Sequence, residues 1–261
     1  MTRPFRMADL SWTDYRDRLA EEDPVVLVPV GAIEQHGPHL PLATDCLIPE
    51  AVCGACASRG GRLLAPSITY GYKSLPRCGG GQHFCGTTSV DAATLINQVK
   101  DMVREFARHG VSKLAFVVGH MENTWFVNEA CDLALREARM LGLKAPRIMT
   151  VGYWEFLGED TIRAAFGDTF PDWSLEHAGI METSVMLHLH PSLVTMDRLR
   201  PHPPAKLPLW DMWPYDERLV PADGVLATAI GASAEKGRLF YDEYVATLSG
   251  ALDTAFAEPA D

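Results

Sequence analysis

The stretch PVVLVPVGAIEQHGPHLPLATDCL, Pro24–Leu47, decides how this chain folds and where its chemistry lies. Its first part, PVVLVPVG (24–31), is a valine-rich apolar run bounded by turn residues, which predicts a strand buried on both faces. Directly after it, Glu34, His36 and Asp45 stand among prolines and glycines. A strand end fixes such groups rigidly, as a metal or catalytic site requires.

Outward from this stretch, predicted strands alternate with predicted helices. Apolar runs predict further strands at LLAPSI (63–68), KLAFVVG (113–119) and RIMTVGYW (147–154). Apolar residues at three- and four-residue spacing and capping residues predict helices at 47–58, 89–109, 123–141, 178–189 and 225–256. The Pro-rich segment 201–223 is expected to form a long surface loop or arm. This alternation predicts an α/β fold, with a mostly parallel sheet covered on both faces.

Bulk composition narrows the class of protein. The 261 residues are 47% apolar and 22% charged, which suits one large globular domain or two small ones. A formal charge of −11 argues against nucleic acid as a partner. The chain has no apolar run long enough to span a membrane and no apolar signal region at its N-terminus, so we expect a cytoplasmic protein.

Six cysteines would stay mostly reduced in the cytoplasm. Cys53 and Cys56 form a C-x-x-C pattern, but they lie in an alanine-rich, helical stretch. Buried small residues explain this pattern better than a redox site does.

The ionisable groups that follow the strands form the first candidate site. Glu34 and His36 follow one strand and His120 and Glu122 follow another, so we expect them to meet at the carboxyl edge of the sheet. Together with Asp45 they are two histidines and three carboxylates, which suit Zn²⁺ or Mn²⁺. Five ligands exceed the needs of one open zinc site but fit two ions that share a bridging carboxylate. The alternative is a set of solvated loop groups.

A second candidate site lies in WSLEHAGIMETS (173–184). His177 suits a general acid or base because its unperturbed pKa lies near neutrality, and Glu176 or Glu182 would orient it. The alternative is an ordinary helix N-terminus that carries favourable acids.

Two tryptophans and a glycine-rich loop are candidates for holding a substrate. Trp154 and Trp173 would form the walls of a pocket for a flat or cationic ligand, unless they are plain core residues. The loop 70–88, which includes Tyr72 and Ser74, would supply polar contacts. No G-K-[ST] follows its glycines, so it is not a phosphate loop.

The motifs GAIEQHGPHLPLATD, YGYKS, GGGQHFCGTTS, GHMENTWF and WSLEHAG, followed by ETS, together resemble the creatininase family of creatinine amidohydrolases. The resemblance covers nearly the whole chain, including HPPAKLP and EKG, and so implies a single domain over residues 1–261. It further implies a three-layer α/β/α sandwich, a homo-hexamer, and the interconversion of creatinine and creatine. The breadth of the match favours creatininase activity over that of remoter relatives, which hydrolyse formamides or clip peptides.

Carried over residue by residue, the resemblance implies a site with two zinc ions, with manganese commonly at the exchangeable position. Glu34 and His120 would hold one ion, His36 and Glu122 the other, and Asp45 would bridge them. A water between the ions would attack the ring carbonyl of the substrate.

The resemblance also implies roles for residues around the metals. Trp154 and Trp173 would close over the substrate and His177 would transfer protons, assisted by Glu122 or Glu176.

One residue departs from the family pattern. Met121 lies between His120 and Glu122, where creatininases carry tyrosine, and so removes a hydroxyl group from a predicted substrate contact. This departure keeps open a second hypothesis, a hydrolase of another small cyclic or formyl amide. A non-catalytic metal-binding or redox protein is a more remote alternative.

Overall fold

The computed structural model describes residues 4–257 and is built on one parallel sheet. Within that range the sheet has four strands in the order β2-β1-β3-β4. They are β1 (Val25–Val30), β2 (Arg62–Leu64), β3 (Lys113–Val118) and β4 (Arg147–Gly152). Val30 pairs with Val118, and Val118 pairs with Gly152, so three strands end in line. The predicted parallel α/β sheet is confirmed.

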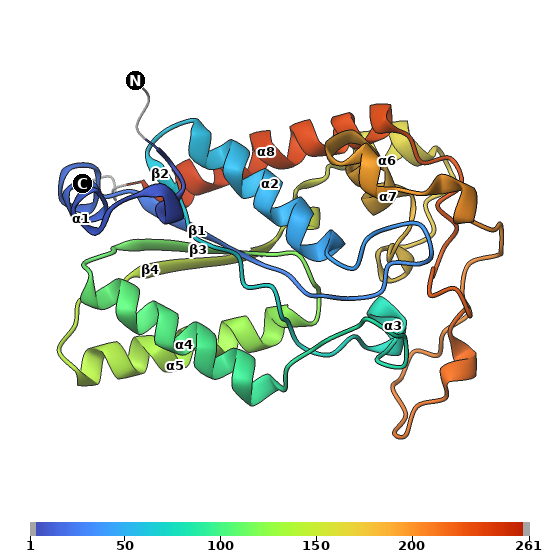
Figure 1. Cartoon of the computed structure of the whole chain (residues 1–261), viewed down its shortest axis with the longest axis horizontal. Helices are drawn as coiled ribbons and strands as arrows, with labels where there is room; N and C mark the ends of the chain where they lie inside the picture. The colour runs from blue at the N-terminus through green and yellow to red at the C-terminus, as the bar shows by residue number, and fades with distance from the viewer. Residues whose placement is uncertain (1–3, 258–261) are drawn as a thin grey trace.

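Helices cover both faces of the sheet (Figure 1). One face carries α2 (Thr44–Ser58) and α8 (Ala234–Phe256), together with α7 (Ile180–Leu189) and α6 (Glu159–Phe166). The other face carries α4 (Ala92–Arg108) and α5 (Asn123–Met140). The short helices α1 (Trp12–Glu22) and α3 (Pro76–Gly79) lie beyond opposite ends of the sheet. The predicted three-layer sandwich is therefore confirmed.

The side chains on each face of β1 belong to a separate apolar core. Leu27 packs with residues of α2 and α8, whereas Val26, Val28 and Val30 pack with residues of α4 and α5. Successive side chains of a strand point to opposite faces. A strand covered on both faces therefore needs apolar residues at every position, which is why the sequence reads as a continuous valine-rich run.

Several predicted elements are shorter than expected. The predicted strand 63–68 begins at Arg62 and ends at Leu64, and the strand predicted to reach 154 ends at Gly152. The helix predicted from 225 begins only at Ala234, because Gly231 has a positive φ of 100° and Ser233 caps the helix by accepting a hydrogen bond from the Lys236 N–H.

Three helices and one helix start lie outside the predicted ranges. α1, α3 and α6 were not predicted, since α1 buries few apolar side chains and α3 and α6 are only 4 and 8 residues long. α2 begins at Thr44 rather than at residue 47, so Asp45 belongs to its first turn.

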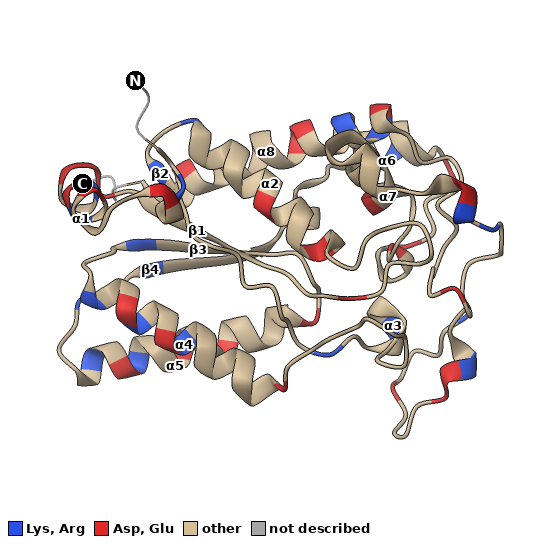
Figure 2. Cartoon of the chain, in the orientation of Figure 1, with Lys and Arg blue, Asp and Glu red and all other residues tan. Residues whose placement is uncertain are grey.

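Charge is distributed unevenly along the sheet (Figure 2). The charged residues of the strands, Arg62, Lys113 and Arg147, each stand at the first position of their strand. No helix in the described range 4–257 is long and apolar enough to cross a membrane. The segment 201–223 forms the expected irregular arm, on which several large apolar side chains are exposed: Leu209, Trp210, Met212 and Trp213.

Candidate active site

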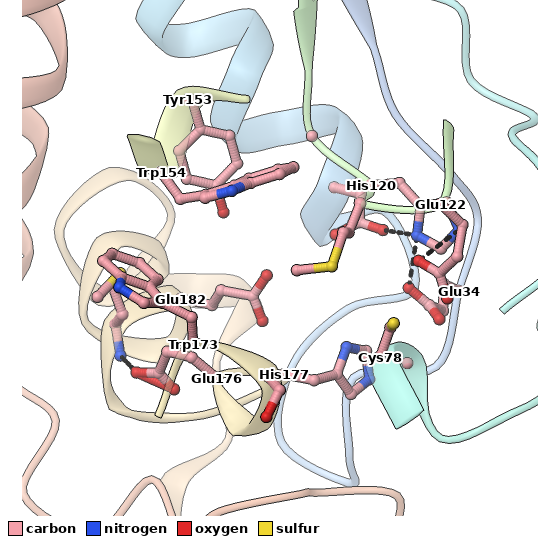
Figure 3. Close-up of a pocket in the computed structure, with 16 residues that line it drawn as sticks. Glu34, Cys78, His120, Glu122, Tyr153, Trp154, Trp173, Glu176, His177 and Glu182 are labelled. Atoms are coloured by element: carbon pink, nitrogen blue, oxygen red, sulfur yellow. Dashed lines mark hydrogen bonds and ion pairs between the residues drawn. The ribbon is translucent and has the colours of Figure 1, made fainter. Parts of the chain in front are cut away.

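A pocket opens at the carboxyl edge of the sheet, where the two sequence-predicted sites meet. Its walls include Glu34, Asp45, His120 and Glu122 from the first site. Residues of the second site, together with both predicted tryptophans, also line it: Trp154, Trp173, Glu176, His177 and Glu182. In Figure 3, Trp154, Trp173 and Glu182 lie on one side of the pocket, opposite Glu34, His120 and Glu122.

Glycines at the ends of β1 and β3 bring α2 into the site. A Cβ on Gly31 would lie 2.6 Å from the Asp45 carbonyl oxygen, and a Cβ on Gly119 would lie 2.2 Å from the same atom. Side chains at these two positions would therefore push away the first turn of α2. Their absence lets Asp45 reach the space between the residues that follow the two strands.

Both histidines of the first site are held by backbone carbonyls. His36 Nδ1 lies 3.1 Å from the Glu34 carbonyl oxygen, and His120 Nε2 lies 3.1 Å from the Tyr72 carbonyl oxygen. The other ring nitrogens face carboxylates: His36 Nε2 is 3.0 Å from Asp45 Oδ1, and His120 Nδ1 is 3.0 Å from Glu34 Oε2. Metal-ligating histidines show this arrangement, with one nitrogen donating to a carbonyl and the other directed at the ion.

The possible ligand atoms form three overlapping groups, and those of each group lie within 4.8 Å of one another. Glu34, His120 and Glu122 make one group, His36, Asp45 and Glu182 make the second, and Glu34, His36 and His177 make the third. Asp45 also reaches the first group, since its Oδ2 lies 3.1 Å from His120 Nδ1. Glu122 Oε2 lies 3.5 Å from His120 Nε2.

The electrostatics of the cluster suit cations. Burial raises the pKa of Glu34 to about 7 and raises that of Glu122. Burial alone would lower the pKa values of His36 and His120, but the surrounding carboxylates raise both well above the usual range. Burial opposes ionisation of Asp45, yet the two imidazoles hold its pKa far below the usual range. Buried carboxylates need compensating positive charge.

Glu34 Oε1 lacks a hydrogen-bond partner among the described residues, and His36 Nε2 makes no well-aligned hydrogen bond there although it lies 3.0 Å from Asp45 Oδ1. A buried polar atom without a partner is costly. Carboxylate oxygens and imidazole nitrogens are also the donors that Zn²⁺ and Mn²⁺ accept. The residues present therefore fit a pair of divalent ions.

His177 and Glu176, the residues predicted to transfer protons, both line the pocket. Burial, reinforced by the nearby His36, lowers the pKa of His177 well below its usual value. The rings of His36 and His177 are 4.5 Å apart. Burial raises the pKa of Glu176 to about 8, although its Oε1 accepts a 2.6 Å hydrogen bond from the Met181 N–H.

Two predicted substrate contacts lie behind the wall of the pocket. The Tyr72 ring packs on Phe126 at 4.2 Å, and only its carbonyl oxygen reaches the site, through His120. Ser74 is buried, and its Oγ accepts a hydrogen bond from the Gly81 N–H at 3.1 Å. Met121 does line the pocket.

Sequence reasoning assigned one residue of this site a different role and missed two others. Glu182 was assigned only an orienting role, yet its Oε2 lies 3.7 Å from His36 Nε2. Asn123 donates to the Gly31 carbonyl and accepts from the Tyr72 N–H, which ties β1 to the glycine-rich loop. Its position directly after Glu122 was the available signal. Cys78 also lines the pocket, without any pattern to predict it.

Cys53 and Cys56 are buried in α2 as free thiols. Their placement supports the interpretation as small packing residues.

Comparison with known proteins gives a consistent result over the whole chain. The family model described as "Creatininase: Creatinine amidohydrolase" matches residues 8–252. The creatinine amidohydrolase of Pseudomonas putida is 43% identical over 257 residues, which cover 98% of this chain and 99% of the relative.

Solved creatininases share the fold. "Creatininase Mn" is 43% identical with a TM-score of 0.95, and a variant of "Zn-Zn type" is 42% identical with a TM-score of 0.96. A variant "complexed with creatine" is 42% identical with a TM-score of 0.95. Each match covers 98% of this chain and 100% of the other. The chain belongs to the creatininase family.

Proposed function

We propose that this protein is a metal-dependent cyclic amide hydrolase that opens the ring of creatinine to give creatine, and catalyses the reverse reaction. One observation carries the proposal. The buried cluster of metal-ligand candidates shares a single pocket with His177, Trp154 and Trp173. The relative from Pseudomonas putida, named for this activity, is 43% identical over nearly the full length of both chains.

The proposed centre holds two divalent ions, zinc or manganese. Glu34, His120 and Glu122 would bind one, His36 and Glu182 the other, and Asp45 would bridge them. When bound, two such ions make a water acidic enough to supply hydroxide near neutral pH and polarise a carbonyl. The family-based assignment of Glu122 to the ion held by His36 stays a prediction beside this grouping, which follows the 3.5 Å distance from Glu122 Oε2 to His120 Nε2.

The remaining residues of the pocket position the substrate and move protons. Trp154 and Trp173 suit a small planar ring between them. As the oxygen of water bonds to the carbonyl carbon and the ring C–N bond breaks, His177 would take the proton from the water and return it to the leaving nitrogen. Its lowered pKa keeps the imidazole neutral and able to accept that proton.

Other residues in and near the pocket would assist the proposed ring opening. Glu122 would share the proton transfer, since it lines the same pocket as His177. Glu176 is protonated at neutral pH because its pKa is about 8, and would donate a hydrogen bond in the pocket. Tyr72 and Ser74 would affect the substrate only indirectly, by holding the glycine-rich loop 70–88 in place.

Turnover of a substrate panel by metal-loaded protein tests the proposal. Creatinine is expected to be hydrolysed faster than other cyclic amides and formamides. His177→Ala should keep its metal and lose about 10²–10⁴-fold in kcat. Full turnover by this variant would remove the proton-transfer role.

Met121 favours one alternative function, the hydrolysis of a different small cyclic or formyl amide, since it lines the pocket. A panel in which creatinine is untouched and such an amide is opened would establish this alternative. Met121→Tyr should then shift the preference toward creatinine.

We further propose that residues 1–261 form a single domain that assembles as a homo-hexamer in the cytoplasm. The six free cysteines agree with a reducing compartment. Leu209, Trp210, Met212 and Trp213 are each at least 63% exposed on the arm 201–223, and such exposed apolar groups favour association. Light scattering checks the hexamer, and a monomeric mass would exclude it.

A further inference from the structure

Gln35 lies between Glu34 and His36 in the sequence, and its side chain joins three separate segments. It is 5% exposed. Its Nε2 lies 2.9 Å from the Gly79 carbonyl oxygen and 2.9 Å from the Gly224 carbonyl oxygen. Its Oε1 accepts a 2.9 Å hydrogen bond from the Gly37 N–H. The amide thus connects the glycine-rich loop, the end of the arm and its own turn.

The same residue makes two contacts with His177. His177 Nε2 lies 2.9 Å from the Gln35 carbonyl oxygen and 2.8 Å from Gln35 Nε2. The side-chain amide nitrogen carries two hydrogens and accepts none. The carbonyls of Gly79 and Gly224 take both hydrogens, so none remains for the imidazole. His177 must then carry its own hydrogen on Nε2 and donate it to the Gln35 carbonyl.

The alternative positions of the His177 hydrogen and the alternative orientation of the Gln35 amide allow fewer hydrogen bonds. If His177 Nε2 carried no hydrogen, its lone pair would face a lone pair of the Gln35 carbonyl oxygen. It would also have to accept one hydrogen of the Gln35 amide, which would leave the carbonyl of Gly79 or of Gly224 without a donor. Turning the Gln35 amide over would set Oε1 against two carbonyl oxygens, and Nε2 against the Gly37 N–H. Amide and imidazole orientations are assigned from such networks.

The backbone of Gly224 lies directly against the Gln35 amide. Its φ is +78°, and a Cβ built there would lie 2.0 Å from Gln35 Oε1. Glycine at this position therefore lets the arm close onto the amide.

We infer that Gln35 is a positioning residue that fixes His177 as the Nε2–H tautomer, so that the catalytic proton enters and leaves at Nδ1. The inference rests on the proton-transfer role proposed for His177. Within residues 4–257 no group hydrogen-bonds to His177 Nδ1, and His177 lines the pocket. Protonation at Nδ1 leaves the Nε2–H bond intact, so the ring keeps its position through the reaction.

Solid-state ¹⁵N NMR of the zinc-loaded protein, with ¹⁵N-labelled histidine, tests the tautomer directly. The signals that disappear in His177→Gln belong to His177. We expect a protonated Nε2 and a bare Nδ1 in the wild-type protein at neutral pH. A bare Nε2 would overturn the inference. This experiment depends neither on turnover nor on the folding of a Gln35 variant.

Kinetics of Gln35→Met test the positioning role. The thioether keeps the length of the side chain but leaves the Gly79 and Gly224 carbonyls without donors. We expect kcat to fall by about 10–100-fold with KM and metal content nearly unchanged, as for other residues that orient a catalytic group. In Gln98→Met, the matched control, the lost amide belongs to an exposed residue of α4, and kinetics should stay near wild type.

The two proposals fail in different ways. Wild-type kinetics in Gln35→Met would contradict the positioning role, even if creatinine is the substrate. Conversely, a protein that shows the expected tautomer but leaves creatinine untouched would refute the proposed function alone.

Discussion

Asp45 is the residue that joins the two halves of the ligand cluster. Its two carboxylate oxygens face different imidazoles, Oδ1 toward His36 and Oδ2 toward His120. It is delivered by the first turn of α2, whereas the other ligand candidates come from later segments or from the loops after β1 and β3.

We therefore expect Asp45→Ala to lose both ions and at least about 100-fold in kcat, because each site loses a shared ligand. Elemental analysis of the purified variant measures the loss. Asp132→Ala, which removes an exposed carboxylate from α5, is the control and should keep its metal. Two tightly bound ions in Asp45→Ala would contradict the bridging role.

The raised pKa of Glu176 predicts how the stability of the protein depends on pH. Its carboxyl has a pKa of about 8 in the folded protein and 4.5 as the reference value, so the folded state holds a proton that the unfolded state releases. Stability from this group is fully present below the unfolded value and falls as pH rises toward about 8. Glu176→Gln keeps the neutral shape and the acceptor for the Met181 N–H.

The free energy of unfolding of Glu176→Gln, relative to wild type, should thus increase between about pH 5 and about pH 9. Urea titrations of the metal-loaded proteins at both values measure the difference. A difference that stays constant with pH would show that Glu176 is ionised in the folded state.

Single residues were predicted unevenly from the sequence. Glu34, His36, His120 and Glu122 were recognisable because they directly follow apolar runs that read as strands. The contacts of Gln35 with His177 and of Glu182 with His36 were not, since they join segments that lie 142 or more residues apart in the sequence. Contacts of this kind depend on how loops fold back, which no local pattern encodes.

Among the elements, α2 has the strongest link to the site. Gly119 ends β3 against its first turn, and a Cβ there would lie 2.2 Å from the Asp45 carbonyl oxygen and 2.6 Å from Pro49 Cγ. We expect Gly119→Ala to cost about 1–3 kcal/mol of stability, as overpacking does, and to weaken metal binding by moving Asp45.

Gly250→Ala is the matched control for this prediction. Gly250 lies within α8, and nothing lies within 4 Å of a Cβ built there. The change should stabilise the protein by about 0.5–1 kcal/mol through helix propensity. Thermal unfolding and metal titration of both variants measure the effects. Equal stability of the two variants would show that the contact of α2 with the end of β3 is loose.

The quality of each element prediction followed its apolar pattern. α4 was found because Leu95, Val99 and Val103 recur on one face and are all fully buried. α1 escaped notice because Arg18 is the residue that it buries deeply, an arginine that donates to the carbonyls of Pro4 and Arg62. Helix ends set by caps were predicted less well than helix centres.

At the scale of the whole molecule, strand order creates the site. The last residue of β1, Val30, and the first residue of β3, Lys113, are separated by 82 residues (31–112), yet Val26–Val30 pair with Leu114–Val118. The alternation of strands and helices predicted a parallel sheet, but it did not specify which strands are neighbours. The pairing of β1 with β3 places the loop that carries Glu34 beside the loop that carries His120.

The part of the pocket wall formed by α7 and the turn before it also depends on long-range packing. α7 and the turn before it bring Glu176, His177 and Glu182 to the pocket, and α7 packs against α8 and α2. The sequence predicted these residues as a separate constellation. Only the folded structure shows that they line the same pocket as the metal-ligand cluster, because no local sequence pattern relates the two segments.

Metal dependence of creatinine turnover tests the central claim most directly. Protein stripped with a chelator is assayed for conversion of creatinine to creatine, then titrated with Mn²⁺ or Zn²⁺ while bound metal is counted. We predict no turnover by the stripped protein, and activity that returns in full as two ions bind per chain. Turnover that survives complete removal of metal, or two bound ions without any hydrolysis of creatinine, would contradict the account.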